Sequence, residues 1–99
     1  MQNRTMALAG FLGLTAGNLL LAAGNYMLYG LGVVAVLELL TATGAALLFV
    51  VGLRDEAAYD FDDPDLPGWM TPALAPGIAF CGAATVLAGL LVVGLSLAG

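Results

Sequence analysis

Residues 31–52 read LGVVAVLELLTATGAALLFVVG, and this stretch sets the class of the protein. It is apolar along almost its whole length, and its single charged side chain is Glu38, at the eighth position. A helix needs about 20 consecutive apolar residues to cross the hydrocarbon core of a bilayer. The stretch therefore predicts a membrane-spanning helix at about residues 31–53.

The rest of the chain continues this pattern on both sides. Hydrophobic residues make up 62% of the 99 residues and charged residues 9%, whereas about 25% of the residues of soluble domains are charged. No charged side chain occurs in residues 5–37 or in residues 66–99. We therefore expect a single-domain, all-α integral membrane protein with three transmembrane helices, the first two forming a tight hairpin. The three helices are expected at about residues 6–27, 31–53 and 71–98.

The N-terminal segment also has a second interpretation. Residues 1–24 combine Arg4, an apolar stretch and the small residues Ala22 and Ala23, which are features of secretory signal peptides. We expect this segment to be retained as the first membrane span, with cleavage as the alternative.

The residue types that are missing exclude several kinds of site. Cys81 is the single cysteine, which excludes an internal disulfide, and the sequence has no histidine and no lysine. Histidine-ligated haem or zinc and a lysine-bound retinal are therefore excluded within this chain. We expect no cofactor and no metal. The chain by itself is not expected to be an enzyme, because it has no nucleophile–base pair and no phosphate-binding loop.

The net charge of -5 makes nucleic acid an unfavourable partner. The absence of lysine, the many alanines and glycines, and the acidic residues between the second and third helices are typical of proteins from high-salt organisms. The composition is therefore haloarchaeal-like.

Residues 54–70 are expected to form an acidic loop in water, because they hold six of the seven acidic side chains. The run that begins at Asp60 is similar to a calcium-binding loop only superficially. Asp65 and Thr71 stand where such a loop requires glycine and glutamate.

Two arginines predict the orientation. With three spans, Arg4 and Arg54 lie on the same side of the membrane, and positively charged residues favour the cytoplasmic side. The N-terminus and the acidic loop are therefore expected in the cytoplasm and the C-terminus outside the cell membrane.

Aromatic residues indicate where the helices leave the membrane, and Tyr26, Tyr29 and Trp69 are expected as anchors at its interfaces with water. Small residues let helix backbones approach closely, and Gly13, Gly17 and Gly89 are expected at helix contacts. Because three helices have limited mutual surface, some of the small-residue faces are expected to meet other chains.

Glu38 needs an explanation inside a membrane span. A charged side chain there costs at least about 2.5–3.5 kcal/mol, so we expect Glu38 to have a protein partner or a path to water. With a turn centred near Tyr29, Asn18 lies level with Glu38, and Thr41 supplies a further polar group on the second helix. These three residues are interpreted either as a proton relay or as a buried polar contact.

Three short motifs carry a family resemblance. Gly24 and Tyr26 form a G-x-Y near the end of the first helix, E-L-L follows at 38–40, and DPDLP at 63–67 approximates a D-P-L-P before the third helix. This pattern resembles the small three-helix K subunit of complex I-type quinone oxidoreductases. It is also similar to the C subunit of multisubunit sodium/proton antiporters.

The resemblance implies a proton-channel role for Glu38. The sequence departs from the family where Thr41 and Ala42 replace an expected asparagine–alanine pair. The second membrane glutamate of the K subunit, on the third helix, has no counterpart.

We therefore expect a small accessory or structural subunit of a larger membrane complex, respiratory or ion-translocating, whose partners are membrane lipid and larger membrane-protein subunits. One alternative is a proton-conducting subunit that uses Glu38. Another is a holin-like or pore-forming protein that assembles as a homo-oligomer.

Overall fold

The computed structural model describes residues 3–55 and 71–98, which form three α-helices. The helices are α1 (Asn3–Tyr29), α2 (Val33–Arg54) and α3 (Thr71–Ala98). Their lengths are 27, 22 and 28 residues. At about 1.5 Å per residue, even α2 is about 33 Å long, which matches the roughly 30 Å thickness of a bilayer core.

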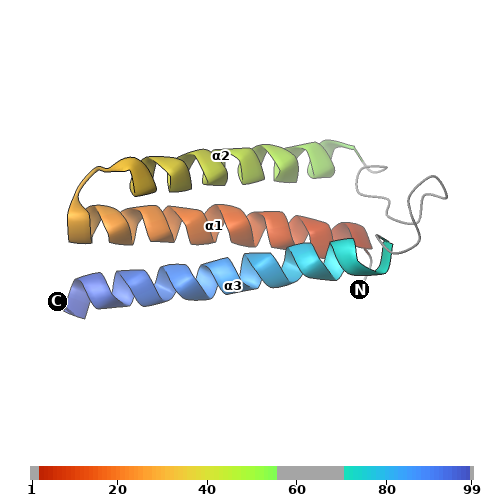
Figure 1. Cartoon of the computed structure of the whole chain (residues 1–99). Helices are drawn as coiled ribbons and strands as arrows, with labels where there is room; N and C mark the ends of the chain where they lie inside the picture. The colour runs from red at the N-terminus through yellow and green to blue at the C-terminus, as the bar shows by residue number, and fades with distance from the viewer. Residues whose placement is uncertain (1–2, 56–70, 99) are drawn as a thin grey trace.

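The three helices lie in a row with α1 in the middle (Figure 1). α1 packs against both α2 and α3, whereas no Cα atom of α2 comes within 8 Å of a Cα atom of α3 in the described ranges. Figure 1 shows α1 and α3 running in the same direction and α2 running against both. In the described ranges, every close approach between helix backbones therefore involves α1.

A three-residue turn joins α1 to α2. Gly30 has φ 78°, a left-handed conformation that glycine adopts without strain, and its N–H donates to the carbonyl oxygen of Tyr26 at 2.8 Å. Gly32 is the N-cap of α2 and makes no side-chain capping hydrogen bond. This turn reverses the chain, so that α2 returns along α1.

In the contact between α1 and α3, glycines bring the two helix backbones close together. A Cβ added to Gly13 would lie 2.8 Å from the carbonyl carbon of Gly82, and one added to Gly89 would lie 2.8 Å from the carbonyl oxygen of Gly17. Such distances are too short for real Cβ atoms. Only glycine permits this approach, which follows the small-residue mode of packing in membrane helices.

Little of the chain is buried within itself. Within the described ranges, the buried hydrophobic side chains are all alanines, and no large side chain is fully buried. Exposed leucines lie on all three helices, exposed valines on α2, and exposed aromatic side chains on α1 and α3. Each helix is long and apolar enough to cross a membrane, so the all-helical fold is compatible with a multi-pass membrane protein.

The observed helix ends differ slightly from the predicted ones. α1 ends at Tyr29 rather than near residue 27, and α2 begins at Val33 rather than near residue 31, because the turn is centred on the glycines. Arg54 belongs to α2, and most of the predicted acidic loop, with the calcium-like run and Trp69, lies outside the described residues.

Candidate functional site

The face of α1 that meets α2 carries three polar side chains, which are separated by multiples of seven residues. Positions seven apart lie on one side of a helix, and this face carries Arg4, Phe11, Asn18 and Asn25. On α2 the same spacing places Glu38 on one face with Ala45 and Gly52, both of which are buried. Glu38 therefore lies on the face of α2 that contacts α1.

Asn25 and Glu38 form a hydrogen bond across this contact. The amide Nδ2 of Asn25 donates to Oε1 of Glu38 at 2.8 Å, and the bond is partly buried. Glu38 is the sixth residue of α2, so it lies only about 8 Å along the helix from the turn. Among the described residues, no side chain or backbone group donates to the second carboxylate oxygen, Oε2.

The expectation that Asn18 pairs with Glu38 is not met. Asn18 is buried, 8% exposed, and its Nδ2 donates to the carbonyl oxygen of Leu14 in its own helix at 2.7 Å. The turn lies further along the chain than the predicted centre near Tyr29, which shifts the register of α2 against α1. Glu38 therefore comes level with Asn25, about two helical turns beyond Asn18.

Thr41 does not join the pair either. Its hydroxyl donates to the carbonyl oxygen of Leu37 at 2.9 Å, and the side chain is exposed. Thr43 makes the equivalent bond to Leu39 at 2.9 Å. Both hydroxyls are satisfied within α2, and neither forms a hydrogen bond with another helix in the part of the chain that the structure describes.

A second polar contact lies at the other end of the α1–α2 pair, away from the turn. Nη2 of Arg4 donates to the carbonyl oxygen of Gly52 at 2.6 Å, one of the last carbonyls of α2, which lack partners within the helix. The Nε atom of Arg4 is buried without a hydrogen-bond partner in the described structure. The hydrogen bonds that Glu38 and Arg4 form therefore lie near opposite ends of the α1–α2 contact.

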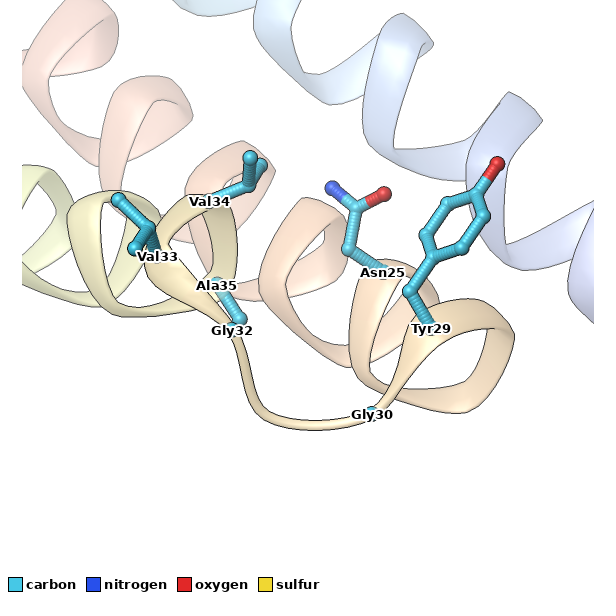
Figure 2. A pocket seen from close by; sticks show the side chains of 7 residues that line it. All are labelled: Asn25, Tyr29, Gly30, Gly32, Val33, Val34 and Ala35. Atoms are coloured by element: carbon cyan, nitrogen blue, oxygen red, sulfur yellow. The ribbon is translucent and has the colours of Figure 1, made fainter.

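A pocket of about 220 Å³ opens beside Asn25, between the end of α1 and the start of α2. Figure 2 shows Asn25 and Tyr29 on the α1 side and Val33 and Val34 on the α2 side, with Gly30 and Gly32 in the turn. Its wall on the α2 side ends at Ala35, one turn before Glu38. Asn25 therefore lies between the pocket and the carboxylate.

The remaining predicted residues have separate positions. Gly13, Gly17 and Gly89 all lie in the α1–α3 contact, away from Glu38. Tyr26 and Tyr29 are exposed at the end of α1 beside the turn. Trp69 lies outside the described residues.

Sequence reasoning missed two features that the seven-residue spacing could have indicated. Asn18 and Asn25 are seven apart, so both were candidates to face Glu38, and only the position of the turn distinguishes them. The α1–α3 contact also includes Gly10, Gly24 and Gly82. Gly10, Gly17 and Gly24 are again seven apart.

Chemically, the site is a carboxyl group held by an amide inside an apolar helix pair. A carboxyl group can accept a hydrogen bond through either oxygen and can take up or release a proton. Within residues 3–55 and 71–98 no group of three metal-ligating side chains accompanies it.

Comparison of the sequence with protein-family models and with curated proteins, and comparison of the fold with solved structures, found no match. The resemblance to the K subunit and to the antiporter C subunit therefore stays a prediction.

Proposed function

We propose that the chain is a small accessory subunit of a larger complex in the cell membrane, which it crosses three times. The observation that carries this proposal is the open row of helices. Among the described residues, α2 and α3 each contact only α1, and no large side chain is fully buried. Additional helices from larger subunits would cover the exposed sides of α2 and α3, and lipid would cover the remainder.

In the membrane, α1 and α2 act as a hairpin, and its open end faces the cytoplasm. Arg4 bonds to Gly52, two residues before Arg54, so both arginines belong to the same end of the helix pair. Positively charged residues favour the cytoplasmic side. The 30–32 turn and the C-terminus are then outside.

We propose a respiratory or ion-translocating complex for two reasons. The E-L-L motif resembles that of the K subunit, and carboxyl groups within membrane spans often belong to ion or proton pathways. In this subunit, the Asn25–Glu38 bond ties α2 to α1. Hydrogen bonds of this kind contribute about 0.6 kcal/mol on average.

The test is to purify a tagged copy from native membranes in mild detergent and identify its companions by mass spectrometry. Larger respiratory or antiporter subunits at a fixed ratio would support the proposal. Recovery of the chain alone as a homo-oligomer would contradict it and favour a self-assembling, pore-forming protein.

A second candidate function is proton conduction through Glu38. Its support is that Oε2 has no hydrogen-bond partner in the described chain, so one oxygen is available to a proton donor or acceptor. Glu38→Gln keeps the size and the acceptor for Asn25 but cannot release a proton. Loss of proton flux in assembled Glu38→Gln complexes, with flux retained in Thr41→Val, would support this function over a purely structural role.

A further inference from the structure

We infer that the side of α2 next to Glu38 is the contact with a transmembrane helix of a larger subunit, and that this helix carries an arginine or a lysine that pairs with Oε2 of Glu38. The inference rests on the accessory-subunit function proposed above. It adds which helix of the chain makes the polar contact and which chemical group the partner presents.

The first argument is the unsatisfied half of the carboxyl group. Glu38 is half-buried, and Asn25 donates to Oε1, but no described residue donates to Oε2. An acidic side chain within a membrane span is costly and usually pairs with another group. Because each carboxylate oxygen can accept a hydrogen bond, Oε2 is open to a donor that another chain supplies.

The second argument is the position of the positive charges. The sequence has two arginines, no lysine and no histidine. Arg54 lies about 24 Å along α2 from Glu38, and Arg4 bonds to Gly52 at that same end. A second copy with the same orientation also has its arginines at that end. A positive charge at the level of Glu38 therefore has to come from a different protein.

The third argument is the face of α2 that continues from Glu38. Val34 and Thr41 stand four residues before and three residues after Glu38, and both are exposed. Leu37 and Gly44 extend this face at spacings of three and four residues, which are typical of packed helices. Nothing lies within 4 Å of a Cβ added to Gly44, so the backbone of a partner helix can approach closely there.

α3 has no comparable face. It contains no charged side chain, and the hydroxyl groups of Thr85 and Ser96 donate to carbonyl oxygens of their own helix. Phe80, Leu87 and Leu91 are exposed on it, and lipid can cover such side chains without the loss of a hydrogen bond. The polar contact with the partner is therefore assigned to α2.

The experiment is photo-crosslinking of the full-length chain in its native membranes. The photoreactive amino acid benzoylphenylalanine replaces Leu37 in one variant and Leu95 in another, and mass spectrometry identifies the cross-linked peptides. Leu37 and Leu95 are similarly exposed, at 56% and 65%. Val92 lies against Gly24 of α1, so Leu95 of α3 is near the depth of Asn25.

We expect the Leu37 variant to cross-link to a larger subunit, within one helical turn of an arginine or a lysine. Glu38→Gln keeps the acceptor for Asn25 but removes the charge. It should lower this yield at least about tenfold, because the hydrogen bond between two charged groups is lost. Changing the partner's basic residue to glutamine as well should restore most of the yield, because no charge is then left unpaired. Products from Leu95 should not change.

A Leu37 product whose cross-linked segment holds no basic residue would overturn the inference, as would a yield that Glu38→Gln leaves unchanged. The absence of a Leu37 product from a chain that still co-purifies with larger subunits would also overturn it. In these three cases the accessory function stands. If Leu37 cross-links only to a second copy of the chain, the accessory function is itself wrong and the inference falls with it.

Discussion

The two contacts of α1 are built from different chemistry. Toward α3, glycines bring backbone against backbone, and a Cβ on Gly82 would collide with the carbonyl oxygen of Gly10. Toward α2, alanines pack between two polar bonds, Asn25 to Glu38 and Arg4 to Gly52. The first contact depends on glycines, at which an added Cβ would collide with the facing helix, whereas the second depends on a few polar groups that set its register.

The largest effect is expected in the glycine contact. Gly82→Ala should lower the free energy of unfolding by about 1–3 kcal/mol, because the new methyl group must push α1 and α3 apart. Gly94→Ala is the matched control in α3, where nothing lies within 4 Å, and should be neutral or slightly stabilising. Steric-trapping measurements in bicelles give both values, and equal effects would contradict the described α1–α3 contact.

A smaller effect is expected at the open end of the α1–α2 contact. Arg4→Ala removes a hydrogen bond from a charged donor and should cost about 1.5 kcal/mol, the lower end for such bonds. The lower end applies because the buried Nε of Arg4 has no partner and its desolvation offsets part of the gain. Arg54→Ala, at an exposed position, should change the same unfolding measurement by less than about 0.5 kcal/mol.

The polar pair near the turn can be isolated with a double-mutant cycle. Asn25→Ala and Glu38→Ala should show a coupling of about 0.6 kcal/mol, the average for such bonds within membranes. The cycle of Asn18→Ala with Glu38→Ala should show none, because Asn18 bonds to Leu14 in its own helix. A larger coupling for Asn18 would restore the register that the sequence predicted.

The smallest effect is expected from the exposed threonine of α2. Thr41→Val should change the unfolding free energy of the isolated chain by less than about 0.5 kcal/mol, because its hydroxyl bonds only to Leu37. The same variant in the native complex sharpens the comparison. If it weakens co-purification of larger subunits there, this face of α2 is a contact with a partner.

The three helices could be predicted from the sequence because composition alone limits what a long apolar run can become. Without water, a backbone satisfies its hydrogen bonds only within a helix or a closed barrel. The ends of the helices could be predicted less closely. Gly30 and Gly32 are both typical turn residues, but the sequence does not show which of them has the positive φ.

The partner of Glu38 could not be predicted for the same reason. α1 ends two residues later than predicted, and α2 begins two residues later. Glu38 therefore lies level with Asn25 of α1 instead of Asn18. Spacing defines which face a residue occupies, and the turn defines its depth. The contact glycines were found only in part. A four-residue spacing led to Gly13 and Gly17, whereas the glycines of α1 in this contact follow spacings of three, four and seven residues and also include Gly10 and Gly24.

The central place of α1 also has a consequence for biogenesis. Because α2 and α3 contact α1 but not each other, neither needs the other in place before it docks. The nascent chain can complete the α1–α2 pair, with both of its polar bonds, once residue 54 has left the ribosome. A nascent chain arrested after Arg54 has left the ribosome, but before α3 is released, should therefore already protect Glu38. α3 would then join through the separate, glycine-rich contact with α1.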